Sequence, residues 1–423
     1  MSPLVRARAL AAAIVVAAVL APIALVSGIA TGAAGPPPTP VPPHGSLSPF
    51  PSELSTPSDA TVAPELSARA ALLADLDTGQ ILDALHVNDP RPIASITKIM
   101  TALLILERMD PAHVVVVDPR AVFHRHDFGA DSTLGLHAGE RITVQDLLYG
   151  LLLGSANDAA SALAIAEAGS ETAFVGQMNA RAHALGMRHT RFRSVHGLDD
   201  RGHSTAADLL RLVRAADRTA GFDRITATRQ HSIPPPRGPA RRIQNRNALL
   251  WLYPGSFGTK TGTTSGAGAC LVASAQRDGR RLVAIVLGAP HEPFSDAASL
   301  LDYGFAGFTP RTIVAAGDDR GMVAMRGGAA SVVAGATLTA LVPVAGGGVT
   351  ARTVVDPTVA FPPSRGQRVG AVVFSAAGLP LGGVPLVVST VPPPPPVGGA
   401  WWIRAPRSIG RAVVGAIEAI AGS

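Results

Sequence analysis

The sequence is poor in cysteine, lysine and aromatic residues. Its single cysteine, Cys270, excludes an intrachain disulfide and, because it lies far from the N-terminus, a lipid-modified N-terminal cysteine. Cys270 sits in an apolar run and is expected to be a small buried side chain. Aromatic residues make up 4% of the chain. No Lys/Arg block interleaved with aromatics occurs, so nucleic acid is not an expected partner. The formal net charge of +6 suits an anionic surface instead.

The low number of lysines is the most informative of these features. Of the 36 basic residues only two are lysines, Lys98 and Lys260. Arginine stays charged in proteins, whereas a lysine can lose its proton when its surroundings depress its pKa. Because arginine supplies every other basic side chain, the two lysines are predicted to perform chemistry that arginine cannot.

The N-terminus has the order of a secretory signal. Arg6 and Arg8 precede an apolar run, and small residues follow as far as Ala34. Residues 1–34 are therefore expected to be a signal peptide or an uncleaved N-terminal anchor, with cleavage favoured. Residues 35–64 are rich in Pro, Ser and Thr and are expected to form a flexible linker. Both segments predict an exported protein.

A folded domain is expected over residues 65–308. Apolar spacing predicts helices before strands, and hence a mixed α/β or α+β core. The expected elements are a strand entering a turn at 71–80, helices at 96–107 and 145–169, and two adjacent strands at 260–275 and 281–289 with a turn at Asp278-Gly279.

The character of the chain changes after residue 308. Short Val/Ala/Thr runs separated by glycine-rich turns predict a small all-β domain over 309–391. Residues 392–423 begin with a run of prolines and continue as an amphipathic tail. This tail could lie on a membrane surface or dock as an ordinary helix on a domain.

Ser95 and Lys98 form a Ser-x-x-Lys motif at the start of an apolar-periodic helix. At this spacing the hydroxyl and the amine lie on the same helical face. A serine hydroxyl attacks poorly until a base takes its proton, and a desolvated lysine can be that base. The motif alone also fits a capped helix.

Ser155 and Asn157 form a Ser-x-Asn motif between two apolar helices. In a functional interpretation Ser155 relays a proton, and the Asn157 amide fixes the lysine and the substrate. In a structural interpretation Ser155 and Asp158 form a capping box at the start of the second helix.

Lys260, Thr261, Gly262 and Thr263 begin an expected strand. The glycine would allow another backbone to approach closely, as a substrate strand does in β-augmentation. The lysine charge and the threonine hydroxyls could bind a substrate carboxylate. A strand edge followed by a turn is the structural alternative.

The three motifs occur in the order Ser-x-x-Lys, Ser-x-Asn and Lys-Thr-Gly, and two of them contain the only lysines. This combination is typical of serine enzymes that react with β-lactams. With further segments, the chain resembles the low-molecular-mass penicillin-binding proteins, the D-alanyl-D-alanine carboxypeptidases of peptidase family S11. The resemblance is firm over 68–304 and looser in the β domain. The further segments are Gly139 to Leu148, Met178-Asn179, Leu185 to Met187, His196 to Leu198, Ser204 to Asp208 and Asn245 to Cys270.

The resemblance implies a serine β-lactamase/penicillin-binding-protein-like transpeptidase fold, with an antiparallel sheet flanked by helices and a small C-terminal all-β domain. It implies that peptidoglycan stem peptides ending in D-Ala-D-Ala are substrates and β-lactams inhibitors, with no cofactor and no metal. The implied roles are Ser95 as nucleophile, Lys98 as general base, Ser155 and Asn157 in proton transfer and substrate holding, the N–H groups of Ser95 and Thr263 as oxyanion hole, and Lys260, Thr261, Gly262, Thr263 and Arg246 in substrate binding.

Two other classes of protein share part of this pattern. A class A β-lactamase shares the fold and the motifs but needs a deacylating glutamate in a Glu-x-x-x-Asn loop. Neither Glu167 nor Glu171 has asparagine four residues later. A non-catalytic scaffold would have no reason to keep Ser95, Lys98 and Lys260. Ser194, where relatives often have asparagine, is expected to alter a loop rather than the chemistry.

Overall fold

The computed structural model describes residues 61–124, 127, 129, 132–234, 240–291 and 293–390. The expected signal or anchor at 1–34, most of the linker at 35–64 and the tail at 392–423 lie outside these residues. Within the described ranges, no helix is long and apolar enough to cross a lipid bilayer.

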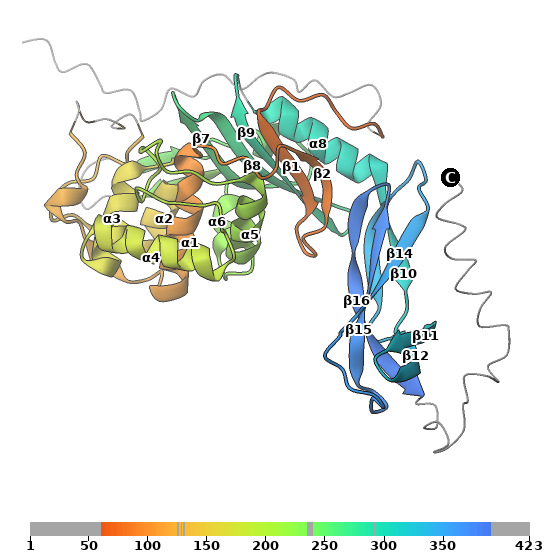
Figure 1. The fold of residues 1–423 in the computed structure, drawn as a ribbon. Coiled ribbons are helices and arrows are strands. Elements are labelled where there is room, and N and C mark those ends of the chain that lie inside the picture. The colour runs from red at the N-terminus through yellow and green to blue at the C-terminus, as the bar shows by residue number, and fades with distance from the viewer. Residues whose placement is uncertain are drawn as a thin grey trace, which may run out of the picture. The chain divides into compact units, whose positions relative to one another are not determined.

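A five-stranded antiparallel sheet organises the larger part of the chain (Figure 1). Its strands run in the order β2-β1-β9-β8-β7, so β7 is a terminal strand. The strands are β1 (Ala70–Asp75), β2 (Ile81–Leu85), β7 (Ser256–Thr264), β8 (Gly268–Arg277) and β9 (Arg280–Ala289).

Both faces of this sheet are covered by helices. Successive side chains of a strand point to opposite faces. Accordingly Leu72 of β1 packs in one apolar core with the helices from α1 onward, while Leu73 packs in a second core with α7 and α8. Figure 1 shows α1 to α6 on one side of the sheet and α8 on the other. The helices are η1 (Ala94–Thr97), α1 (Lys98–Arg108), η2 (Pro119–Ala121), α2 (Val144–Leu152), α3 (Asn157–Ala168), α4 (Glu171–Ala184), α5 (Ala206–Asp217), α6 (Phe222–Thr226), α7 (Leu249–Leu252) and α8 (Phe294–Gly307).

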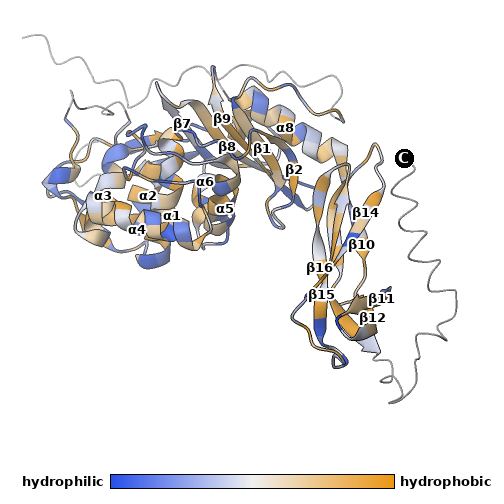
Figure 2. Cartoon of the chain, viewed as in Figure 1, coloured by the Kyte–Doolittle hydropathy of each residue, from blue (hydrophilic) through white to orange (hydrophobic). Residues whose placement is uncertain are grey.

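Burial on both faces explains the composition of the central strands. Strands covered on two sides have nearly continuous apolar sequences rather than an alternating pattern. All six residues of β1 are buried, and Figure 2 shows the strands of this sheet as mainly hydrophobic. Alanine and aliphatic side chains supply this core, so few aromatic residues are needed.

One predicted strand was wrong and one predicted turn is confirmed. The stretch 260–275 is not a single strand: it contains the end of β7, a turn at 265–267 and most of β8. The Ser265-Gly266 pair is a turn signal that the prediction of one long strand did not take into account. The turn at Asp278-Gly279 joins β8 to β9, with φ of 49° and 75° at its two residues. Positive φ at both central residues is the geometry that such two-residue hairpins favour.

The C-terminal region is all-β, as expected. A five-stranded sheet has the order β11-β12-β16-β15-β14, and β10 pairs with β13. Two further two-stranded sheets, β3 with β4 and β5 with β6, belong to the first region. The remaining strands are β3 (Val114–Val116), β4 (Arg141–Thr143), β5 (Gln230–Ile233), β6 (Arg241–Gln244), β10 (Phe308–Val314), β11 (Asp319–Met325), β12 (Gly328–Ala334), β13 (Leu338–Pro343), β14 (Val349–Val355), β15 (Arg368–Ala376) and β16 (Leu379–Thr390).

Candidate active site

Ser95 lies in the short helix η1, and α1 begins three residues later at Lys98. Ala94 has φ of +46°, a left-handed conformation that costs free energy for a residue with a side chain. Gly197 packs directly on this turn: a Cβ added to Gly197 would lie 1.9 Å from the carbonyl oxygen of Ala94. The His-Gly-Leu segment therefore supports the strained turn that carries Ser95.

Lys98 is fully buried and contacts three groups. Its Nζ lies 2.9 Å from Ser95 Oγ, 2.7 Å from Asn157 Oδ1 and 2.8 Å from the carbonyl oxygen of His196. The amide and carbonyl oxygens can only accept hydrogen bonds. A neutral amine has two N–H groups and one lone pair, so donation to these two oxygens leaves its lone pair for the Ser95 hydroxyl.

Asn157 is held in the orientation that this arrangement needs. Its Nδ2 donates to the carbonyl oxygen of Gly129 at 2.8 Å, which fixes Oδ1 toward Lys98. Ser155, three percent exposed, lies in the turn between α2 and α3 with φ of +60°. The capping-box alternative was wrong, because Ala156 is the N-cap residue of α3 and no side chain caps the helix.

Lys260 lies on the terminal strand β7 and is almost fully buried, with Nζ 2.8 Å from the carbonyl oxygen of Thr261. Cross-strand pairing with Val272 and Cys270 places Lys260 and Gly262 on the face that packs against the helical layer of Ser95. The threonines of the motif, at 261 and 263, alternate to the other face.

Gly262 meets the turn of Ser95 itself. A Cβ at this position would lie 2.9 Å from the backbone nitrogen of Ser95 and 3.0 Å from that of Ile96. The close approach expected at this glycine is therefore made by the chain's own η1 turn. This contact brings the Lys-Thr-Gly strand beside the Ser-x-x-Lys motif.

Arg246 is exposed and reaches the same region from the segment before α7. Its Nη1 donates to Ser132 Oγ at 3.0 Å. The neighbouring Asn245 donates from Nδ2 to the carbonyl oxygens of Thr226 and Thr228, which anchors the segment.

The electrostatics of the site are dominated by positive charge. Burial lowers the pKa of Lys98 well below its usual range, and Lys260 and Arg246 lower it further, while Asp158 raises it. Burial, followed by the Arg246 charge, also lowers the pKa of Lys260. Burial of an amine favours its neutral form, which is the form that a general base requires.

His196 contributes a backbone group that sequence reasoning missed. From the sequence, the His-Gly-Leu segment was recognised only as a feature of the family. In the structure, the carbonyl oxygen of His196 accepts a hydrogen bond from Lys98. Burial and the Lys98 charge lower the pKa of the imidazole to about 3, so the ring is neutral near pH 7. Ser194 Oγ accepts from the Gly197 N–H at 2.9 Å, which shows how serine closes this loop.

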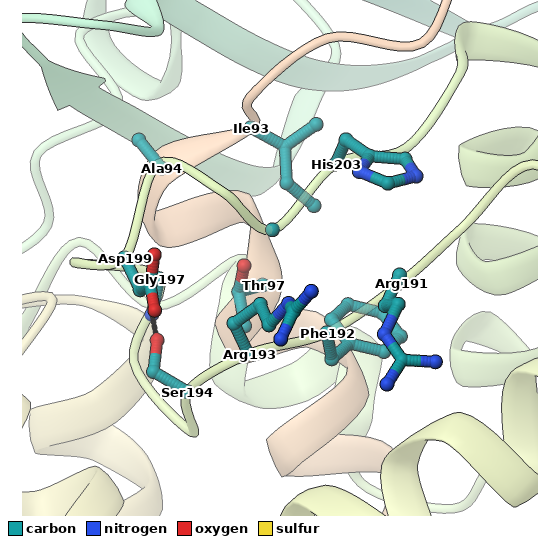
Figure 3. A pocket seen from close by; sticks show the side chains of 11 residues that line it. Ile93, Ala94, Thr97, Arg191, Phe192, Arg193, Ser194, Gly197, Asp199 and His203 are labelled. Atoms are coloured by element: carbon teal, nitrogen blue, oxygen red, sulfur yellow. Dashed lines mark hydrogen bonds between the residues drawn. The ribbon is translucent and has the colours of Figure 1, made fainter.

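A small pocket lies on the outer side of this loop (Figure 3). Its lining includes Ala94 and Thr97 of the η1 turn but neither Ser95 nor Lys98. The other lining residues are Ile93, Arg191, Phe192, Arg193, Ser194, Gly197, Asp199, Gly202 and His203. This pocket is therefore not the candidate active site.

Cys270 is buried, as expected, and burial raises the pKa of its thiol to about 11. In the part of the chain that the structure describes, no three His, Cys, Asp or Glu side chains are grouped to hold a metal ion.

Comparisons with known proteins agree with this geometry. Residues 57–291 match the family of D-alanyl-D-alanine carboxypeptidases, peptidase family S11. D-alanyl-D-alanine carboxypeptidase DacC of Escherichia coli is 33% identical over 344 residues, which cover 77% of this chain and 84% of that protein. DacF of Bacillus subtilis is 35% identical over 243 residues, which cover 56% of this chain and 62% of DacF.

The fold agrees as well. The crystal structure of penicillin binding protein 6B from Escherichia coli superposes with a TM-score of 0.61 at 32% identity, covering 79% of this chain and 99% of that one. The expected fold class, a helix-flanked antiparallel sheet with a C-terminal all-β part, is confirmed. The motifs, the geometry and the sequence match together show that the chain belongs to the D-alanyl-D-alanine carboxypeptidase family of serine peptidases, peptidase family S11.

Proposed function

We propose that this protein removes the terminal D-alanine from peptidoglycan stem pentapeptides through an acyl-enzyme on Ser95. One observation carries the proposal: the Lys98 amine lies 2.9 Å from Ser95 Oγ, and its two other contacts are both obligate acceptors. This arrangement supplies an uncharged amine that is positioned to take the proton of Ser95.

In the acylation step, Lys98 takes the proton of Ser95 while Oγ attacks the carbonyl carbon of the penultimate D-alanine. The N–H groups of Ser95 and Thr263 stabilise the tetrahedral oxyanion, a role that preorganised donors commonly fill. The C–N bond then breaks. Lys98, with Ser155, returns the proton to the leaving D-alanine nitrogen, and Asn157 holds the lysine and the substrate.

Deacylation completes the cycle. Water gives a proton to Lys98 and its oxygen attacks the ester carbonyl. The C–Oγ bond breaks, Ser95 regains its hydrogen, and the shortened peptide leaves with a new carboxylate. No cofactor enters these steps.

Substrate binding is assigned to the Lys-Thr-Gly strand and Arg246. The substrate carboxylate would meet the positive charges of Lys260 and Arg246, while the hydroxyls of Thr261 and Thr263, on the other face of β7, would bind the adjacent amide. Gly262 permits the close contact between β7 and the η1 turn. Since β7 ends its sheet, an extended peptide can add along its free edge.

β-Lactams are proposed to acylate Ser95 in the same way and so to inhibit the enzyme. An exported, extracytoplasmic protein of the cell envelope, associated with the membrane surface through the N-terminal segment or the amphipathic tail, fits this substrate.

A class A β-lactamase is less well supported. Glu167 accepts from Arg108 Nη1 at 2.9 Å. Arg108 ends α1, whereas Lys98 begins it, so the two lie about 15 Å apart along the helix at 1.5 Å per residue. Glu167 is thus remote from the acylation site.

Mass spectrometry of the intact protein after incubation with penicillin tests the proposal. We expect one covalent adduct on Ser95 that persists, together with D-alanine release from a pentapeptide. A short-lived adduct would identify a β-lactamase, and no adduct would identify a scaffold. Ser95→Ala should abolish both the adduct and D-alanine release, and an adduct retained by this variant would assign the nucleophile elsewhere.

A further inference from the structure

Asp158 is a buried carboxylate beside the site that the proposed mechanism does not use. It follows Asn157 directly in the first turn of α3 and is 1% exposed. Its oxygens accept from the backbone N–H groups of Leu134, at 2.8 and 2.9 Å, and of Leu136, at 3.0 Å. Its Oδ1 also accepts from the N–H of Ala159 at 2.9 Å.

These bonds connect two parts of the active site. The same segment is joined to Asn157, whose backbone N–H donates to the carbonyl oxygen of Ser132 at 2.7 Å. The side chain of Ser132 accepts from Arg246. Asp158 thus holds the segment that links the residue contacting Lys98 to the residue assigned to the substrate carboxylate.

Asp158 also brings charge to the site. Burial raises the pKa of Asp158, while the backbone N–H groups that donate to it lower that pKa. Both of its oxygens accept N–H donors, which matches the ionised form because a protonated carboxyl would present one O–H to a donor. The charged groups acting on Lys98 are Lys260 from β7, Arg246 from the segment before α7 and Asp158 from α3; the His196 ring, from the loop, is neutral. Among these groups, Asp158 carries the negative charge.

We propose that Asp158 is a positioning residue for acylation: its carboxylate ties the 132–136 segment to α3, and it places a negative charge next to Asn157, the residue that contacts the Lys98 amine. This inference rests on the proposed function.

The charge has a defined effect on the base. Lys98 must be neutral to accept the Ser95 proton, so the acylation rate falls as pH drops through its pKa. A nearby anion raises that pKa, and a stronger base accepts a proton more readily in the transition state. Without the anion the acid limb of the rate profile moves to lower pH and the plateau falls.

Asp158→Asn tests both effects, with the rate of acylation by a fluorescent penicillin measured across pH. We expect a plateau lower by about 10- to 100-fold, since small displacements in a catalytic site cost about 10²-fold, and an acid limb at lower pH. Asp296→Asn is the matched control. Asp296 is also buried and accepts from the backbone N–H of Ser67 and Ala68, at 3.2 and 2.9 Å, but it lies in α8, so its variant should acylate like the wild type.

Asp158→Glu separates charge from position. It keeps the carboxylate but displaces it, so the acid limb should stay at the wild-type pH while the plateau falls. If Asp158→Asn does not fold, a wild-type plateau in Asp158→Glu overturns the proposal by itself.

Three outcomes for folded Asp158→Asn overturn the inference: a wild-type plateau, an unmoved acid limb, or a limb displaced to higher pH. Failure of the wild-type protein to acylate would contradict the proposed function instead, so the two failures are distinguishable.

Discussion

The two folded regions of this chain differ in whether they bury polar side chains. Between residues 75 and 296 the core contains buried polar and charged groups, including both lysines and Asp158. Between residues 308 and 390, all of which the structure describes, no polar or charged side chain is buried. The β region instead encloses valine, alanine, leucine and phenylalanine.

This difference follows from the cost of burying charge. An isolated ion loses its hydration when it is buried and shifts its pKa to the neutral form instead. A core that retains two amines with depressed pKa values therefore gives up stability for reactivity, and such clusters mark functional sites. The apolar β core has no comparable buried polar or charged group.

After Ser95→Ala, the largest expected effect comes from Lys98→Arg. Arginine keeps a positive charge but remains protonated, so it cannot accept the serine proton. We expect acylation to slow by about 10²- to 10⁴-fold, the usual contribution of a general base. Stopped-flow measurement with a fluorescent penicillin checks this, and near-normal acylation would refute Lys98 as the base.

Gly262→Ala should come next. The new methyl group would meet backbone nitrogens of Ser95 and Ile96 at about 3 Å, and backbone cannot move aside as a flexible side chain can. The η1 turn must shift, and we expect about a 10²-fold loss of acylation. Gly176→Ala, in α4, where φ is not positive and an added Cβ meets no atom within 4 Å, is the control for acylation. Equal rates in the two variants would contradict this contact.

The pH profile should show two limbs of opposite sign. Burial lowers the pKa of both lysines; the Lys260 charge lowers that of Lys98 further, while Asp158 raises it. The rate should increase with pH as Lys98 loses its proton and becomes a base, and decrease with pH as Lys260 loses its charge and carboxylate binding weakens. The two lysines are coupled, so the apparent values belong to the pair.

Lys260→Arg distinguishes the two limbs. Arginine keeps its charge at high pH, so the alkaline limb should disappear while the acid limb remains, with a lower plateau from the imperfect fit. A persisting alkaline limb in the kcat/KM profile would show that another group causes it.

The smallest effect on activity is expected from the β core. Leu386→Ala, in β16, should lower the free energy of unfolding by about 2–5 kcal/mol without changing the acylation rate. Leu103→Ala, in the helix that begins with Lys98, should cost similar stability and also slow acylation. Urea unfolding measures the stability, and penicillin labelling measures the acylation rate. Reduced acylation in Leu386→Ala would contradict the proposed difference between the two regions.

Sequence reasoning succeeded where a short pattern determined geometry. The spacing of Ser95 and Lys98 predicted their shared helical face, and the two lie in hydrogen-bonding contact. The all-β composition after residue 308 and the Asp278-Gly279 turn were also predicted correctly, since both depend on local preferences. The roles assigned to individual site residues stay predictions until they are tested.

Sequence reasoning failed where the residues that bond or pack together are distant in the chain. Asp158 was assigned to a local capping box, whereas its partners lie 22 and 24 residues earlier. The His196 carbonyl is 98 residues from Lys98, and Gly197 supports the Ala94 turn from a similar separation. Backbone acceptors and packing contacts of this kind leave no residue-type signal in the sequence.

The enclosure of both lysines has a practical consequence for chemical labelling. The chain has no other lysine, and these two are 0% and 1% exposed. Reagents that acylate primary amines will therefore find no lysine on the surface, and apart from the chain's own N-terminal amine they will react only where the cleft admits them. Slow amine modification, protected by a bound β-lactam, becomes a direct reporter of access to the nucleophile.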